Sequence, residues 1–144
     1  MFFQNQRDKY ILRLEKGEKL NESLLCFAKA QKIYSAFYYG IGGLTDIELG
    51  FFSLEKKEYE KIRLNDYYEL VSLMGNLTLL KTDIFSHAHI TLGTRDFQTI
   101  SGHLFEATIS VTAEIIIFKL PNPIKRFNDP NIGVNLMSLS KKIN

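Results

Sequence analysis

The sequence predicts an α+β sandwich, in which one main helix packs against a sheet of several strands. Only residues 20–32 place apolar side chains at helical spacing. Most of the remaining chain consists of short runs rich in β-branched and aromatic residues, which are typical of strands. The length of 144 residues and the hydrophobic content of 45% suit one domain with its own core, so we expect a single domain over residues 1–144.

The first expected elements are a strand over residues 10–14 and the helix over residues 20–32. A turn at Gly17 separates them. The apolar positions 20, 24, 27 and 28 define the face of the helix that should lie on the sheet. Cys26 stands among these apolar neighbours, and we expect its thiol to be buried in the core. A lone cysteine forms no internal disulfide, which agrees with a reducing compartment.

A glycine-rich segment follows the next strand, which we expect over residues 33–39. Residues 40–45 contain three glycines in four positions, and this requires an unusual backbone path. A glycine-rich loop after a strand can bind phosphate, but such loops lead into a helix and carry a Lys-Ser/Thr pair. Neither feature is present here, so the pattern favours a tight turn or a β-bulge.

Two acidic residues stand out against apolar surroundings. After strands over residues 47–52 and 58–64, the mostly apolar stretch 68–80 includes Glu69, and Glu114 directly precedes the run Ile115-Ile116-Ile117-Phe118. A carboxylate inside such a stretch must be hydrogen-bonded, paired, metal-bound or neutralised if it is buried, and otherwise it is an exposed strand position. Both residues are therefore candidate general bases.

The long segment 99–120 should form a central strand. Its consecutive apolar residues from Ile115 leave no polar face, which indicates cover on both sides or a contact between subunits. Pro121 then ends the strand, and residues 129–133 form a loop before a short apolar end at residues 134–139.

All three histidines of the chain, His87, His89 and His103, fall within a short segment. Side chains alternate along a strand, so His87 and His89 share a face if the segment is extended. A hairpin centred on Asp96 pairs position 89 with position 103 and brings the three imidazoles together. A turn displaced by half a residue instead pairs position 103 with Ala88 and sends His103 to the opposite face. Imidazole is the commonest metal ligand, so the cluster predicts a divalent metal site, with zinc preferred.

Charge and hydropathy exclude several classes of protein. The net charge of +2 requires no polyanionic partner, although basic residues gather near the end of the chain. No apolar run approaches the ~20 residues that span a bilayer, and the first residues lack the apolar stretch of a signal peptide. We therefore expect no membrane partner and a cytoplasmic location.

Several short motifs occur in a characteristic order. They are Gly40-x-Gly42-Gly43-Leu44, Tyr59, Glu69-Leu70-Val71-Ser72-Leu73-Met74-Gly75-Asn76, His87-x-His89, Gly102-His103-Leu104, Ala113-Glu114 and Arg126…Asp129…Gly133. In this order they resemble the plant and prokaryote conserved (PPC) domain family, in its stand-alone prokaryotic form. The resemblance runs over residues 10–139, nearly the whole chain.

This resemblance implies a twisted, mostly antiparallel sheet with one helix packed on it, and assembly into a homotrimer. Some prokaryotic members of the family carry a metal at the histidine cluster, which maps here onto His87, His89 and His103. In plants the domain is joined to an AT-hook that binds the DNA minor groove. This chain has no such hook, so the DNA-binding label that accompanies the family is a weak guide to its function.

Three hypotheses follow from the residues and the resemblance. The first, which we favour, is a trimeric binding or interaction module for a small ligand or another protein, with a metal site at the histidines. The second is a metal-dependent enzyme in which Glu69 or Glu114 acts as general base. The third is DNA binding through two basic groups. These are the segment with Lys119, Lys125, Arg126, Lys141 and Lys142, and the face with Lys56, Lys57, Lys61 and Arg63.

Overall fold

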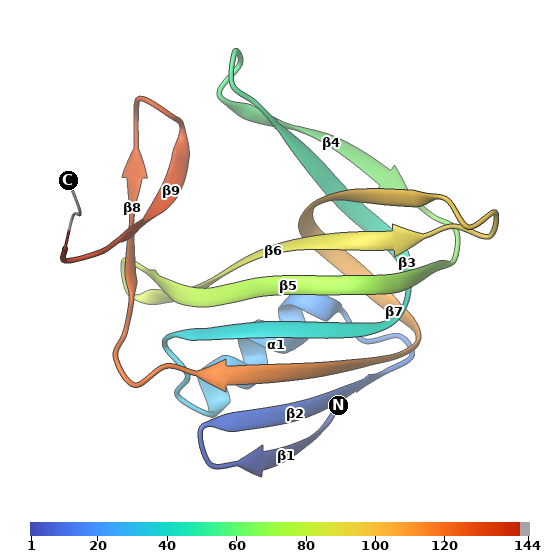
Figure 1. The fold of residues 1–144 in the computed structure, drawn as a ribbon, viewed down its shortest axis with the longest axis horizontal. Helices are drawn as coiled ribbons and strands as arrows, with labels where there is room; N and C mark the ends of the chain where they lie inside the picture. Colours follow the sequence, from blue (N-terminus) through green and yellow to red (C-terminus); the bar gives the residue numbers. More distant parts are fainter. Residues whose placement is uncertain (142–144) are drawn as a thin grey trace.

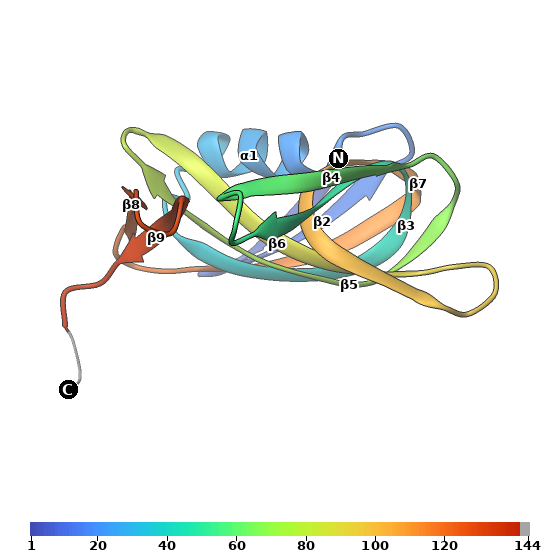
Figure 2. The same ribbon diagram turned by 90° about the horizontal axis from the view of Figure 1, so that it is seen from above.

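A nine-stranded sheet covered on one face by a single helix forms the body of the protein (Figures 1 and 2). This computed structural model describes residues 1–141. The elements are β1 (Phe2–Gln6), β2 (Lys9–Glu15), α1 (Leu20–Ala30), β3 (Ala36–Ser53), β4 (Glu58–Leu64), β5 (Tyr68–Leu80), β6 (Asp83–Gly93), β7 (Thr99–Lys119), β8 (Lys125–Asp129) and β9 (Val134–Ser138). The predicted α+β class, with one helix on a mostly antiparallel sheet, is confirmed.

The two longest strands organise the sheet. The strand order is β1-β2-β7-β3-β5-β8-β9, with β4 paired to β3 and β6 paired to both β5 and β7. Each of these pairs is antiparallel except β5 with β8, which is parallel. Both β3 and β7 bend out of the central sheet, so the end of β3 forms an arm with β4 (Figure 1). The β8–β9 hairpin forms a second arm, and the candidate site lies between the two.

The core lies between α1 and the inner face of the sheet (Figure 2). Leu20, Leu24, Phe27 and Ala28 are buried there, at the positions that helical spacing predicts. Strand β2 alternates exposed and buried residues along its whole length, as a strand with one covered face should. The prediction of a buried Cys26 is wrong, since its side chain is exposed. Position 26 lies two residues from Leu24, about 200° around the helix, and so points away from the core.

A carboxylate from β7 anchors the first turn of α1. Glu106 accepts hydrogen bonds from the backbone N–H groups of Asn21 at 2.7 Å and Glu22 at 3.0 Å. The N-cap residue, Lys19, offers no side-chain cap of its own, so Glu106 fills that role from a distant strand. The helix ends at Ala30, two residues before the predicted end, and Lys32 adopts a left-handed conformation with φ of 52°.

The glycine-rich segment lies inside β3 as β-bulges, one of the two predicted alternatives. Pairing with β5 shifts between Gly40 and Gly42, and pairing with β7 shifts between Gly42 and Leu44. The predicted strands 33–39 and 47–52 are consequently parts of one strand rather than two. The bulges bend that strand without ending it, which lets its two halves pair with different neighbours.

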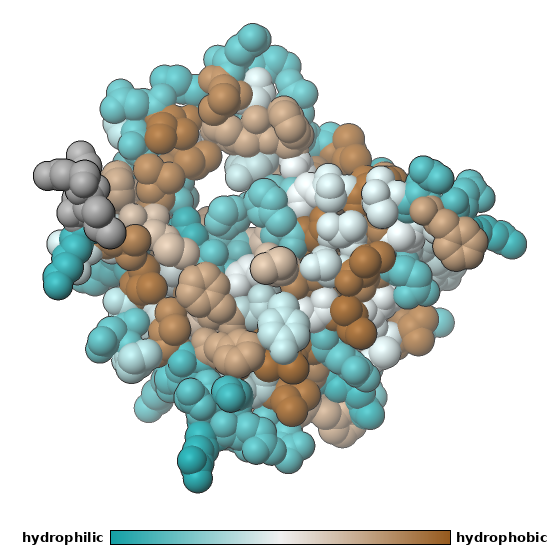
Figure 3. Space-filling view, viewed as in Figure 1, coloured by the Kyte–Doolittle hydropathy of each residue, from teal (hydrophilic) through white to brown (hydrophobic). Residues whose placement is uncertain are grey.

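The strand through Ile115 is central, as predicted, because it pairs with β2 on one side and β3 on the other. Ile115 and Ile117 are buried beneath α1, whereas Ile116 and Phe118 are only half-buried on the opposite face. That opposite face carries several exposed apolar side chains, visible as brown and tan patches in Figure 3. We call it the outer apolar face; it includes Phe37, Tyr39, Ile41, Val71, Met74 and Val111.

The segment after Pro121 is not a loose basic tail. Lys125 and Arg126 belong to β8, and the predicted loop 129–133 connects β8 to β9. Short strands of this kind lack a clear alternation of apolar and polar residues, so β8 was not predicted. Lys142 lies outside the described residues.

We predict that Gly42→Ala destabilises the protein by about 3 kcal/mol, the range of severe core substitutions. A Cβ at position 42 would lie 2.7 Å from Cα of Ala113 and closer still to the carbonyl oxygen of Thr112. These backbone atoms belong to the central strand β7 and cannot move aside. Urea denaturation measures the change in the free energy of unfolding.

Gly93→Ala is the matched control. A Cβ there would come no nearer than 3.3 Å, and its nearest neighbour is a methyl group of the exposed Val71, which can rotate away. We expect a change within about 0.5 kcal/mol. Equal losses in the two variants would contradict the close approach of β3 to β7.

Candidate metal centre

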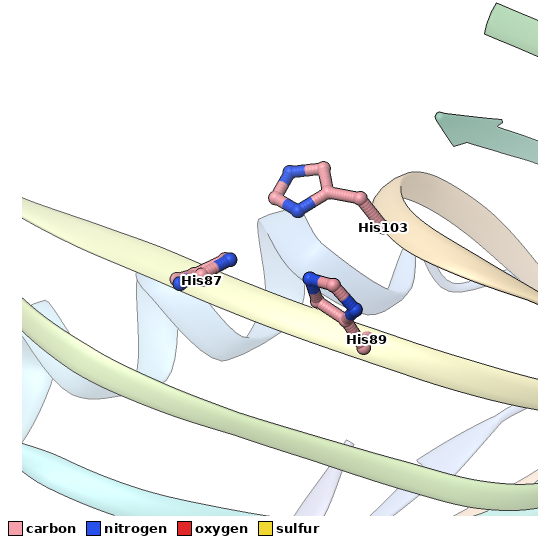
Figure 4. Close-up of side chains that lie close together, drawn as sticks. All are labelled: His87, His89 and His103. Carbon is pink, nitrogen blue, oxygen red and sulfur yellow. The ribbon is translucent and has the colours of Figure 1, made fainter. Parts of the chain in front are cut away.

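The β6–β7 hairpin brings the three histidines together (Figure 4). His89 is directly opposite His103, and His87 lies on the same face of β6 two residues earlier. The ring centroids are 5.1 to 5.4 Å apart in all three pairs. One ring nitrogen of each residue faces the space between the rings (Figure 4), and these candidate ligand atoms lie within 4.8 Å of one another. The predicted pairing of positions 89 and 103 is therefore the one that forms.

The turn between β6 and β7 sets this register. The N–H of Thr94 donates to the carbonyl of Gln98 at 2.9 Å, and the Thr94 hydroxyl accepts from the N–H of Gln98 at 3.0 Å. Phe97 takes a left-handed φ of 59° to close the turn. A shift by one residue would turn His103 to the other side of the sheet, so these local bonds determine whether the cluster exists.

The chemistry of the cluster fits a metal ion. Nδ1 of His103 is buried and has no hydrogen-bond partner among the described residues. A buried polar atom without a partner is costly, and coordination of an ion removes that cost. Neutral imidazoles offer a lone pair to a transition metal, and three of them leave one tetrahedral position for another ligand.

Both half-buried histidines favour the neutral, metal-binding form. Burial lowers the pKa of His103 to about 4, and charges on His87 and His89 act in the same direction. Burial also lowers the pKa of His87, and the nearby charge of Arg126 adds to this effect. No proton therefore has to leave either ring before an ion binds at neutral pH.

Aromatic side chains and an arginine surround the cluster. The His103 ring packs against Tyr59, with centroids 4.6 Å apart, and against Phe105 at 4.9 Å. These contacts restrict the rotation of the His103 side chain. On the other side, Nη2 of Arg126 lies 3.5 Å from Nδ1 of His87.

Arg126 and Tyr59 were not predicted to belong to the site. Arg126 reaches it from β8, which pairs with the end of β5, and Tyr59 reaches it from β4. Neither residue lies near the histidines in the sequence, and no local spacing relates them. Both stood among the family motifs, and that was the only signal that could have pointed to them.

A pocket of about 590 Å³ opens beside the cluster, between the β3–β4 arm and the β8–β9 arm. A Cβ added to Gly133 at the tip of one arm would lie 3.0 Å from Cβ of Lys57 and 3.6 Å from the ring of Phe52 in the other, so the arms approach each other above the pocket. Figure 3 shows the opening between them. The lining residues are Asn21, Tyr59, Asn76, Phe85, Ser86, His87, His103, Leu104, Phe105, Arg126, Gly133, Val134, Asn135, Leu136 and Met137.

The candidate general bases lie elsewhere. Glu69 and Glu114 are both exposed and line a separate hollow beside Ile41, on the outer apolar face. Glu69 pairs with Gly93, four residues along β6 from His89. The structure thus brings the two acids near each other rather than near the histidines. An apolar stretch did not imply burial here, because one side of this sheet faces outward.

The fold and the site define an α+β protein in which one hairpin gathers three histidines beside a pocket with a buried arginine. The chain belongs to the Plants and Prokaryotes Conserved (PCC) domain family, whose sequence profile matches residues 1–121. The resemblance inferred from the sequence motifs is confirmed. No curated protein matches the chain. Among the described residues, no helix is long and apolar enough to cross a membrane.

Three solved structures are similar over nearly the whole chain. A plant- and prokaryote-conserved protein of Pyrococcus horikoshii is 34% identical with a TM-score of 0.86, covering 98% of this chain and 97% of that one. A putative DNA-binding protein of Bacteroides thetaiotaomicron is 26% identical with a TM-score of 0.92, covering 95% and 96%. A metal-containing protein of Archaeoglobus fulgidus is 28% identical with a TM-score of 0.85, covering 96% and 99%.

The lowered pKa of His103 predicts acid sensitivity of the metal-free protein. The folded-state pKa of about 4 lies below the ordinary value of 6.5, so the unfolded chain binds the proton more readily between these pH values. This contribution to stability is complete above about pH 6.5 and is lost as the pH falls toward 4. In EDTA, we expect the melting temperature of the wild type to fall more steeply over this window than that of His103→Gln. The difference in slope should vanish above pH 7; parallel curves throughout would contradict the assignment.

Proposed function

We propose that this protein is a metal-binding module that assembles into a homotrimer and binds a small ligand beside the metal. The observation that carries the proposal is the gathering of three imidazoles whose candidate ligand atoms lie within 4.8 Å of one another. One of them, His103, has a buried nitrogen without a partner among the described residues. The similarity to a metal-containing protein of Archaeoglobus fulgidus supports it.

Zinc is the preferred ion, because three neutral imidazoles suit it and leave a fourth position for a ligand. His87, His89 and His103 would bind it, and the ion would supply a Lewis acid beside the pocket. No Asp or Glu is among the described residues that line this pocket. A carboxylate general base is therefore missing from its wall, which favours binding of a ligand over metal-dependent hydrolysis.

We predict that the wild type retains about one zinc ion per chain after incubation with zinc and dialysis, following the single cluster. His89→Ala should retain less than about a tenth of that amount, because one of the three proposed ligands is lost. His89 is exposed, so this variant should remain folded. Elemental analysis by mass spectrometry measures the metal, and circular dichroism checks the fold.

Ser101→Ala, two residues from His103 on the same strand and also exposed, is the control and should bind zinc like the wild type. Negligible metal in the wild type and in both variants would refute the metal centre.

Self-association is proposed to occur through the outer apolar face. Exposed apolar patches of this kind commonly mark protein interfaces. Val111 at its centre is 72% exposed, and Met74 is 66% exposed. Glu69 and Glu114 border the same face. An aspartate introduced at position 111 would therefore be repelled by their charges, and it would also remove the apolar contact that Val111 makes with a neighbouring subunit.

We predict a homotrimer for the wild type and a monomer for Val111→Asp, measured by light scattering coupled to size-exclusion chromatography. Leu54→Asp is the control, because Leu54 is similarly exposed at 76% but lies at the turn of the β3–β4 arm. This variant should remain a trimer. A monomeric wild type, or dissociation by Leu54→Asp alone, would overturn the assignment.

The DNA-binding hypothesis receives less support from the charges. Two similar proteins are described as putative DNA-binding proteins. In this chain, however, Lys61 and Arg63 both pair with Glu48, and Lys56 pairs with Glu60. These ion pairs neutralise much of the basic face that the sequence suggested. A surface with its cations already paired attracts phosphates weakly, so we do not assign DNA binding to this face.

A further inference from the structure

Among the described residues, Arg126 is a buried cation without an anionic partner. Only 9% of the residue is exposed, and no carboxylate of the described residues lies within 4.0 Å of its guanidinium. Burial lowers the pKa of Arg126, but an arginine side chain remains charged at neutral pH. A buried charge without a counter-ion is costly, so its retention calls for an explanation.

Neutral acceptors hold the guanidinium in one orientation. Nε donates to the hydroxyl of Thr78 at 2.8 Å, Nη2 donates to Oδ1 of Asn76 at 2.8 Å, and Nη1 donates to the carbonyl of Asn135. A guanidinium has five N–H groups; these bonds use three of them, and Nη2 also lies 3.5 Å from Nδ1 of His87. The side chain is thus fixed in place while part of its donor capacity and its whole charge remain available to a ligand.

The surroundings do not compensate for this charge. The pocket wall combines Arg126 with the neutral rings of His87 and His103 and contains no acid among the described residues. A divalent ion held by the three neutral imidazoles would add two positive charges. Two acids of β3 and β7 are engaged elsewhere, since Glu48 pairs with Lys61 and Glu106 binds the first turn of α1.

Much of the pocket lining is apolar. It includes Phe85, Phe105, Val134, Leu136 and Met137, and the centroid of the Phe85 ring lies 5.2 Å from Cζ of Arg126. The volume of about 590 Å³ is within the range of small-molecule sites. One fixed guanidinium matches the single charge of a carboxylate, to which it can donate a charge-assisted hydrogen bond. The lining provides no lysine and no second arginine, as a doubly charged phosphate would require.

We propose that this pocket binds a small organic carboxylate, with its charged group beside Arg126 and its apolar body against the aromatic and aliphatic wall. The inference rests on the proposed function, because the pocket adjoins the histidines that would hold the metal. The charge of Arg126 and the apolar lining specify the class of ligand, which the histidine cluster alone does not define.

Asn76→Asp tests the proposal with almost no change of shape. The new carboxylate takes the place of an amide whose oxygen is 2.8 Å from Nη2 of Arg126, so its negative charge balances that of the guanidinium without any ligand. We expect the dissociation constant of phenylacetate, measured by calorimetry on zinc-loaded protein, to rise at least about tenfold. The melting temperature of the free protein should rise by about 2–4 °C, because the buried charge gains a partner.

Asn128→Asp is the matched control. It makes the same substitution in the β8–β9 hairpin that carries Arg126, at an exposed position outside the pocket lining, and it should bind phenylacetate like the wild type. Phenylacetamide, which has the same shape but no charge, should bind the wild type at least about tenfold more weakly than phenylacetate.

The outcomes separate this proposal from the metal centre. Zinc content is measured on every sample. Negligible zinc would refute the metal centre. The carboxylate site would then still be tested by comparing the wild type with Asn76→Asp in metal-free protein. Equal binding by these two proteins, equal binding of acid and amide, or no binding of phenylacetate, benzoate and hexanoate by the wild type would each overturn the proposal. Tighter binding of inorganic phosphate than of any of these carboxylates would overturn the ligand class.

Discussion

The candidate site depends above all on the register between β6 and β7. His89 is opposite His103 because the turn at Thr94 closes with backbone and side-chain hydrogen bonds at one particular length. Strand geometry then carries His87 to the same face without further specification. A single local constraint thereby brings the candidate ligand atoms of all three imidazoles within 4.8 Å of one another.

The glycines of β3 give the second half of the site its shape. Bulges at Gly40 and Gly42 let one strand serve both as part of the central sheet and as half of an arm. The arm carries Tyr59 over the ring of His103, and its tip approaches Gly133 of the β8–β9 hairpin. The pocket beside the histidines is therefore a product of strand bending rather than of a dedicated loop.

Charge is distributed unevenly over this framework. Acids bind the helix start and the basic face, as Glu106 and Glu48 do, or border the outer apolar face, as Glu69 does. The pocket that contains Arg126 has no acid among the described residues. Burial keeps His87 and His103 in their neutral forms, and Arg126 gives the pocket a positive charge that no lining acid balances. A metal ion and an anionic ligand would complement each other there.

The sequence by itself determined the helix, most strands, the irregular backbone of the glycine segment and the shared face of His87 and His89, because each follows from local spacing or local backbone preference. The register that adds His103 could only be stated as one of two alternatives. Tertiary structure alone decided that Glu69 is exposed and that Arg126 lies beside His87. Those outcomes depend on which strands pair across the whole chain and which side of the sheet the helix covers, and no local pattern carries that information.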